Sequence, residues 1–442
     1  MLGTGLGHYI PLVAYLGFWV MCLVSFGKPL YGLYYLILFL PYRTMRDHFL
    51  IYPLGAQILT ILVLCILIGA LAHGKRLPAS RPYLIWLFFG IYLYFSMWLG
   101  VVLANAPAPL WLSDFNFANW KDYMLIPLIF AAAGMVIEDR KAIRTVILLT
   151  ALSVAFIDRS SLLDSMSRSW ANFDENKRSG GPLGFGANQT SAYLTQFAMF
   201  FWGFVQFSKR YKIKLAGYAL AGVTIFTAMY TFSRAGYLAI LVGVLVLGLL
   251  KDRKLLLVLG GFLLVWQSVV PTAVRERVTM TESSNGQLEA SAQERVDLWE
   301  NAKRSFYHSP LLGNGFATFQ MSEHVDNLKD THNWYVKVLV ETGIAGFIFA
   351  LAFLQQMLAI SYRLFKRASD PLYRGLGLGL FLCVCCLIVT NLFGDRWTYI
   401  EITAPVWVLV SAALRAWNFT LAESAPTSED DPSLNAPAPY YA

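Results

Sequence analysis

Arg234 is the first of several charged or titratable residues whose position in the sequence suggests a functional role. It lies in the run 231–237, between two long apolar stretches with almost no loop around it. We therefore expect it at the membrane surface or just inside, facing protein. A guanidinium group has five N–H donors in fixed directions, and these suit a phosphate or diphosphate. The alternative is a structural arginine that snorkels to the interface.

Arg295 belongs to a second group of basic residues, with Arg275 and Arg277 upstream of it. All three fall in a long segment that the pattern of basic loops, described below, assigns to the periplasmic side. The tendency of cytoplasmic loops to be basic does not explain them there, whereas an anionic ligand would. The alternative is ion pairing with nearby carboxylates, namely Glu276, Glu294 or Asp297.

His332 is the third candidate, in the run 331–335 where this long segment re-enters the membrane. A neutral imidazole there could take a proton from a hydroxyl group near neutral pH, as a general base does. The alternative is a structural histidine. The run 341–346 follows shortly afterwards and contains two glycines.

Several other kinds of site are absent from the sequence. It has no phosphate-binding glycine loop, no carboxylate-rich metal motif in a periplasmic segment and no Ser-His-Asp pattern, so we predict neither metal nor cofactor. The five cysteines fall inside apolar runs and are interpreted as packing residues; they are Cys22, Cys65, Cys383, Cys385 and Cys386.

The elements that hold these residues are predicted to be membrane-spanning helices. Hydrophobic residues make up 57% of the 442-residue chain and charged residues 14%, against about 25% charged in a soluble domain. The apolar residues form continuous blocks of about 17–25 residues, long enough for a helix to cross a bilayer. The fold class is therefore an all-α polytopic transmembrane bundle of 12 or 13 helices, depending on whether 9–26 and 29–41 are both spans.

Short basic loops separated by pairs of apolar blocks predict the topology. These loops are expected to be cytoplasmic, and the segments between them periplasmic. The C-terminus is then cytoplasmic, while the side of the N-terminus stays open. The same loops account for the net charge of +8, so we do not expect nucleic acid as a partner. The expected partner is the lipid bilayer.

Four regions are predicted along the chain. Residues 1–270 and 333–421 form the N-terminal and C-terminal transmembrane helices, and 271–332 forms one large periplasmic loop region. Residues 422–442, rich in Pro, Ser, Asp and Glu, are expected to be a disordered cytoplasmic tail. Within the loop region an amphipathic helix is predicted over 291–307, with an apolar face at helical spacing made of Val296, Trp299, Ala302 and Phe306.

Taken together, the segments over about 218–350 resemble the superfamily of O-antigen ligases and O-antigen polymerases, which are polytopic membrane glycosyltransferases. Four motifs carry the resemblance in order: Ser233-Arg234-Ala235-Gly236, the S-x-x-x-R-x-x-x-W run from Ser291 to Trp299, Ser309-Pro310-Leu311-Leu312-Gly313-Asn314-Gly315, and His332-Asn333-x-Tyr335 leading to Glu341-x-Gly343-x-x-Gly346. The segments 28–33 and 180–189 are also similar, the latter containing Asn188 at the start of a span.

The resemblance implies an undecaprenyl-diphosphate-linked glycan as donor, an acceptor hydroxyl on a lipid or glycan, and a site facing the periplasm of a bacterial inner membrane. Arg234 and Arg295 match the family arginines that hold the diphosphate, and His332 matches the histidine that activates the acceptor. Arg277, Asn333, Tyr335 and Asn188 are candidates for further donor or acceptor contacts. The implied reaction inverts the anomeric carbon without a metal or cofactor.

The motifs are shared by enzymes that use this donor, so they do not indicate which acceptor is used. An O-antigen ligase, which moves a glycan to lipid A–core, is the leading interpretation. An O-antigen or exopolysaccharide polymerase working on the lipid carrier, or a protein O-glycosylating ligase, is the alternative. A transporter or flippase is less favoured, because it predicts ionisable residues at the middle of the spans and the spans have very few.

Overall fold

The computed structural model describes residues 9–111, 113–167, 173, 178, 180–280, 290–321 and 331–424. Within these ranges the regular elements are helices and no strand occurs, which confirms the predicted all-α class. The α-helices are α1 (Tyr9–Gly27), α2 (Pro29–Phe39), α3 (Arg43–Asp47), α4 (Ile58–Ala72), α5 (Arg81–Leu103), α6 (Phe115–Val136), α7 (Arg140–Met166), α8 (Ala187–Phe204), α9 (Tyr211–Met229), α10 (Arg234–Leu250), α11 (Lys254–Val269), α12 (Thr272–Thr279), α13 (Ala290–His308), α14 (Trp334–Arg367), α15 (Pro371–Asn391) and α16 (Ile400–Ser424). Most of the predicted tail, from residue 425, lies outside the described residues.

Six described helices are long and apolar enough to cross a membrane: α4 with the short turn before it, α5, α7, α14, α15 and α16. A seventh span results if α11 and α12, bent by 107° at their junction, are counted as one broken span. The apolar helices α1, α2 and α10 are shorter. The chain is thus a multi-pass membrane protein, but the predicted count of 12 or 13 spans is not confirmed.

The centre of the bundle is formed by α15 and α16. In their most apolar stretches, 72% of the residues of α15 and 78% of those of α16 are buried, against 39–50% in the other four spans. Glycines let α15 approach its neighbours closely, because a Cβ at Gly203 of α8 would stand only 3.0 Å from the Cα of Gly379. On the opposite side Gly377 lies against the backbone of α14. Small residues on two faces of α15 therefore set the position of both neighbouring helices.

The helix α14 is interrupted at Gly343, where φ is +62°. The segment 310–315 docks into this interruption. Four backbone hydrogen bonds of 2.9–3.1 Å join the two, from Ile344 to Pro310, Ala345 to Leu311, Asn314 to Val340 and Gly315 to Glu341. Two of the sequence motifs that carry the family resemblance are thus one structural unit.

Replacing Gly343 with alanine should destabilise the protein by at least about 2 kcal/mol, because positive φ strains an L-residue and the new Cβ would meet backbone. That Cβ would stand 2.6 Å from the N atom of Gly313. Thermal unfolding in detergent measures the effect. Gly260→Ala in α11 is the matched control, since nothing lies within 4 Å of its Cβ position. Equal melting temperatures for the two variants would contradict the assigned role of Gly343.

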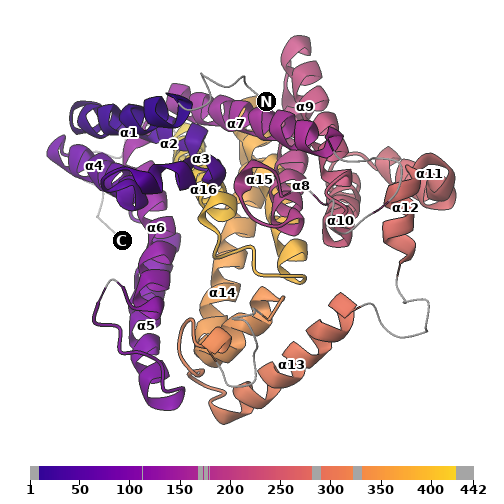
Figure 1. Cartoon of the computed structure of the whole chain (residues 1–442). Coiled ribbons are helices and arrows are strands. Elements are labelled where there is room, and N and C mark those ends of the chain that lie inside the picture. The colour runs from indigo at the N-terminus through magenta and orange to yellow at the C-terminus, as the bar shows by residue number, and fades with distance from the viewer. Residues whose placement is uncertain are drawn as a thin grey trace, which may run out of the picture.

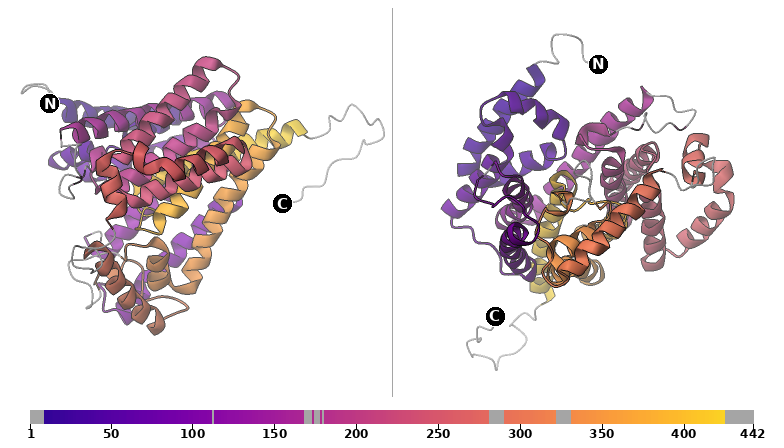
Figure 2. Two further views of the ribbon diagram at one scale, coloured as in Figure 1. Left: turned by 90° about the vertical axis from the view of Figure 1, so that its right-hand side faces the viewer. Right: turned by 60° about the horizontal axis from the view of Figure 1, so that its bottom comes forward.

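The predicted amphipathic helix is present as α13, which lies outside the main stack of helices and packs on α14 (Figure 1). Its buried face agrees with the predicted one in part. Ala302 and Phe306 pack with Leu298 against Phe319 and α14, as predicted for the first two, whereas Val296 and Trp299 are about 40% exposed. The prediction omitted Leu298 because the helix carries apolar residues on two sides. In Figure 2 the α13–α14 region projects from one end of the stack.

Candidate functional site

Four of the predicted site residues meet in one cavity of about 260 Å³, which we call the arginine cavity. The described residues that line it are Asn188, Ser233, Arg234, Ala235, Leu238, Arg277, Arg295 and Phe393. They come from α8, the start of α10, α12, α13 and the loop after α15. The fold therefore brings together three arginines and an amide that are far apart in the sequence.

The electrostatics of the arginine cavity favour an anion. Its described lining contains three arginines and no carboxylate. Ser233 and Arg234 stand at the beginning of α10, a helix of 17 residues. The first N–H groups of a helix and its positive dipole end also favour negative charge. A compact group with several negatively charged oxygens, such as a diphosphate, fits this combination.

Backbone carbonyls and an aromatic ring hold two of the arginines in place. Arg234 donates a hydrogen bond from Nη1 to the carbonyl of Met280 (2.8 Å). Arg277, only 5% exposed, donates from Nε to the carbonyl of Phe232 (3.3 Å) and stacks its guanidinium 4.8 Å from the ring centre of Phe173. Because these contacts fix the two side chains, little reorganisation is needed when an anion binds.

Arg178 is a further residue of this site that the sequence interpretation missed. It donates from Nε to the carbonyl of Thr231 (3.2 Å) and from Nη2 to Oδ1 of Asn188 (2.7 Å). It thus links the turn before α10 to the start of α8. A signal was present in the sequence, since Arg178 is a basic residue in a segment predicted to face the periplasm, where the positive-inside rule does not explain it.

His332 is not among the described residues that line this cavity, but its neighbour Thr331 contacts α13. Arg295 lines the cavity, and one turn later Trp299 donates from Nε1 to the carbonyl of Thr331 (2.9 Å), next to His332. The backbone of His332 has φ +53°, a conformation uncommon for residues other than glycine. The structure therefore positions His332 beside α13 with a constrained backbone.

The other predicted contacts have structural partners. Asn333 caps α14, and its Oδ1 accepts from the N–H groups of Tyr335 (3.0 Å) and Val336 (3.3 Å). The Tyr335 hydroxyl donates to the carbonyl of Ile388 in α15 (3.1 Å). Neither side chain lines the arginine cavity. Contact of Asn333 or Tyr335 with donor or acceptor therefore stays a prediction from the sequence.

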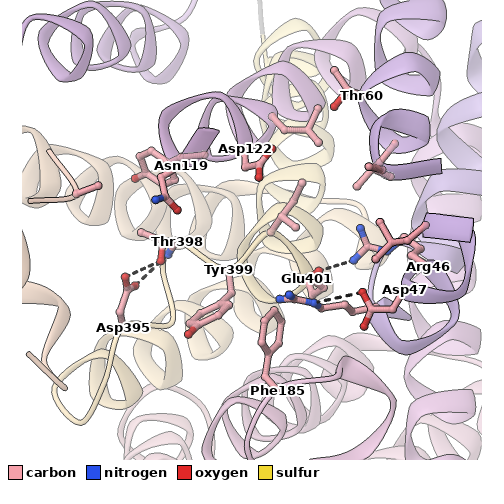
Figure 3. Close-up of a pocket in the computed structure, with 18 of the residues that line it drawn as sticks. Arg46, Asp47, Thr60, Asn119, Asp122, Phe185, Asp395, Thr398, Tyr399 and Glu401 are labelled. Carbon is pink, nitrogen blue, oxygen red and sulfur yellow. Dashed lines mark hydrogen bonds and ion pairs between the residues drawn. The ribbon is translucent and has the colours of Figure 1, made fainter. Parts of the chain in front are cut away.

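A second and larger cavity, of about 510 Å³, was not predicted from the sequence (Figure 3). We call it the carboxylate cavity, because its described lining has five carboxylates and three cations. The carboxylates are Asp47, Asp122, Glu341, Asp395 and Glu401, and the cations are Arg43, Arg46 and Lys337. Lining residues also come from the segment 55–60, α6 and the segment 316–320.

Ion pairs connect the walls of the carboxylate cavity. Arg46 of α3 pairs with Glu401 of α16, and Lys337 pairs with Asp395 at 3.0 Å. Asp395 also accepts hydrogen bonds from the N–H (3.0 Å) and hydroxyl (2.5 Å) of Thr398. Burial alone would raise the pKa of the Asp395 carboxyl, but the Lys337 ammonium and the Thr398 bonds outweigh it and hold the pKa below its usual range.

The depressed pKa of Asp395 predicts a dependence of stability on pH. Because its folded-state pKa lies below the unfolded value of about 3.9, the contribution of Asp395 is present above about pH 4 and is lost as the pH falls through the folded-state pKa. We expect Asp395→Asn to lower the melting temperature at pH 7 and to flatten its decline in acid. Melting curves in detergent between pH 3 and 7 measure this, with the exposed Glu300→Gln as the charge-matched control. An unchanged acid slope in Asp395→Asn would contradict the prediction.

In comparisons with known proteins, a family model matches the part of the sequence that contains most of the predicted site residues. Residues 218–351 match the family model described as O-Antigen ligase. A stretch of 168 residues is 26% identical to a Haemophilus influenzae protein described as an uncharacterized protein, covering 32% of this chain and 41% of that protein. This chain therefore matches less than half the length of that relative. The matched family region contains Arg234, Arg277, Arg295 and His332, while Asn188 precedes it.

Proposed function

We propose that this chain, whose residues 218–351 match the family model described as O-Antigen ligase, transfers a glycan from an undecaprenyl-diphosphate donor to an acceptor hydroxyl. The match supports a membrane enzyme that acts on polysaccharide. The donor, the inverting mechanism and the role of ligase, with lipid A–core as acceptor, are our proposals beyond it.

One observation carries the proposal: Arg234, Arg277 and Arg295 converge on one cavity with no carboxylate in its described lining. A diphosphate leaving group gains charge as the glycosidic bond breaks. Fixed guanidinium groups in a poorly hydrated cavity stabilise that charge more in the transition state than in the ground state. The site therefore favours a reaction in which a diphosphate departs.

The proposed reaction step assigns one role to each group. The acceptor oxygen attacks the anomeric carbon while His332 takes the hydroxyl proton. The bond from the anomeric carbon to the phosphate oxygen breaks, and its electron pair leaves with undecaprenyl diphosphate held by Arg234 and Arg295. Because attack occurs opposite the leaving group, the anomeric configuration inverts.

We further propose that the protein resides in a bacterial inner membrane with the site toward the periplasm and the C-terminus in the cytoplasm. The distribution of basic loops supports this orientation. The division into helices 1–270, a periplasmic region 271–332 and helices 333–421 follows from it. The tail from 422 is proposed to be cytoplasmic.

A polymerase or a protein O-glycosylating ligase remains the alternative, since both use the same donor. A transporter is less favoured. Asp158 is a buried carboxylate within the span α7, but it accepts a hydrogen bond from Thr224 (2.6 Å) and lines neither cavity.

The glycan profile of a deletion strain tests the proposal. Loss of long glycan on the core lipid, with accumulated lipid-linked polymer, supports the ligase. Products with a single repeat unit would indicate the polymerase instead. Unchanged surface glycan, glycoprotein and lipid-linked pools would overturn glycan transfer altogether.

We predict that the reaction requires no divalent metal. Among the described residues, no group of three His, Cys, Asp or Glu side chains is arranged to hold a metal ion. The arginines supply the positive charge that a metal would otherwise provide. Transfer by purified protein should persist in excess EDTA, with a known Mg²⁺-dependent glycosyltransferase as the control. Activity that is lost in EDTA and restored by Mg²⁺ or Mn²⁺ would contradict this.

A further inference from the structure

The carboxylate cavity has the size and lining of a ligand site. Its volume of about 510 Å³ lies within the range of roughly 300–1,000 Å³ that small-molecule sites occupy. In Figure 3, Asn119 and Asp122 of α6 point into it from one side, and Tyr399 and Phe185 lie on the other. Asn119 and Asp122 are exposed, so these polar groups can reach a ligand.

The charge of this cavity is opposite to that of the arginine cavity. Each of its three cations is paired with a carboxylate of the same cavity: Arg43 with Asp47, Arg46 with Glu401 and Lys337 with Asp395. Asp122 is paired with Lys121, which is not among the lining residues, so the lining carries an excess of negative charge. A phosphorylated or carboxylated ligand is disfavoured here, whereas hydroxyl or ammonium groups are favoured.

Aromatic rings complete a lining suited to sugars. Phe185 and Tyr399, both partly exposed, pack edge to face with their ring centres 4.4 Å apart, and the Arg43 guanidinium lies 4.3 Å from the ring centre of Phe185. Carboxylate and amide oxygens accept hydrogen bonds from sugar hydroxyls, and carboxylates do so with the strength of charge-assisted bonds. Aromatic rings supply apolar area for the C–H faces of the sugar.

Two short segments form walls of both cavities. Phe185, just before α8, lines the carboxylate cavity, and Asn188 in the first turn of α8 lines the arginine cavity. Phe393 lines the arginine cavity, and Asp395 two residues later lines the carboxylate cavity. The two cavities are therefore neighbours. A sugar attached to a diphosphate in the arginine cavity would have the carboxylate cavity next to it.

We propose that the carboxylate cavity is a saccharide subsite that takes neutral or amino sugars and rejects phosphorylated ones. This inference rests on the proposed function and adds the substrate class of its glycan side. The saccharide belongs either to the donor next to its diphosphate or to the acceptor. The chemistry is the same in both cases, and the kinetic test separates them.

Replacing Asp122 tests the subsite in the transfer reaction of the full-length protein. Asp122→Ala should raise the KM of one glycan substrate about tenfold or more, as expected for a lost hydrogen bond to a charged group, with kcat little changed. A raised donor KM assigns the sugar to the donor, and a raised acceptor KM assigns it to the acceptor. Glu300→Ala, an exposed carboxylate of α13 that lines neither cavity, is the control. Unchanged KM values for both substrates would overturn the proposal.

A binding experiment separates this proposal from the proposed function. Saturation-transfer NMR on the purified protein without donor uses chitotriose, a glucosamine trimer and glucose 6-phosphate as probes. Binding of either trimer that weakens in Asp122→Ala, while any binding of the sugar phosphate is unchanged by that substitution, supports the subsite even if no transfer is detected. Transfer without trimer binding, or binding of the sugar phosphate that also weakens in Asp122→Ala, would overturn the subsite and leave the proposed function standing.

Discussion

Replacing Arg234 with lysine is expected to reduce transfer nearly as much as replacing it with alanine. Lysine keeps the charge but loses the planar fork that engages two phosphate oxygens at once. Loss of one such contact in a shielded site should cost about 2–4 kcal/mol of transition-state stabilisation, a decrease in rate on the order of a hundredfold or more. The same result is expected for Arg295, because both residues line the arginine cavity.

The measurement is the transfer rate with a lipid-diphosphate donor for each lysine and alanine variant, together with its melting temperature in detergent. Arg275 provides the matched control, because it donates to the carbonyl of Gln267 (2.8 Å) and does not line the cavity. Arg275→Lys and Arg275→Ala should retain transfer. Full activity in the lysine variants of both Arg234 and Arg295 would exclude bidentate diphosphate binding and leave them as structural cations.

Replacing His332 with alanine is expected to abolish measurable transfer while the protein still inserts and folds. A positioned general base contributes about 10²–10⁴-fold to a rate, and no other histidine lies in the runs that match the family motifs. The position of His332, beside α13 one turn from Arg295, is consistent with a base that acts next to the bound diphosphate.

The positive φ of His332 requires a second variant. Alanine tolerates that conformation poorly, so a loss of activity in His332→Ala could come from the backbone. Asparagine adopts positive φ more readily and lacks a basic side chain. We expect His332→Asn to be as inactive as His332→Ala with a melting temperature near that of the wild type. Near-normal turnover in either purified variant would remove His332 from the role of base.

The helical class and the family region could be predicted because they depend on local chemistry. Continuous apolar blocks predict helices in a membrane whatever their neighbours are, because lipid leaves no other partner for backbone polar groups. The four motifs gave the correct region, 218–351, because their spacing is a property of the chain alone. The same blocks leave the number of spans open, since apolar length does not distinguish a helix facing lipid from one buried in protein.

The site itself was predictable only in part. Arg277 and Arg295 were identified by charges that the positive-inside rule does not explain, and Arg234 by its position between two apolar runs. Arg178, which donates a hydrogen bond to Asn188, was not identified. The buried face of α13 was predicted correctly only at Ala302 and Phe306, because periodicity does not rank two overlapping apolar faces. The carboxylate cavity was not predicted, since its polar residues, apart from Glu341 in a family motif, are single side chains on separate elements.

By itself the sequence determined that this chain is a helical membrane protein with arginines and a histidine at defined points of one family region. Only the tertiary structure decided that Asn188, Arg234, Arg277 and Arg295 share a cavity and that a carboxylate-lined cavity adjoins it. The physical reason is that the cavities form where helices pack closely and where a helix is interrupted, as α14 is at Gly343. Such packing depends on the shapes of helix surfaces that are far apart in the chain, and local sequence patterns do not contain this information.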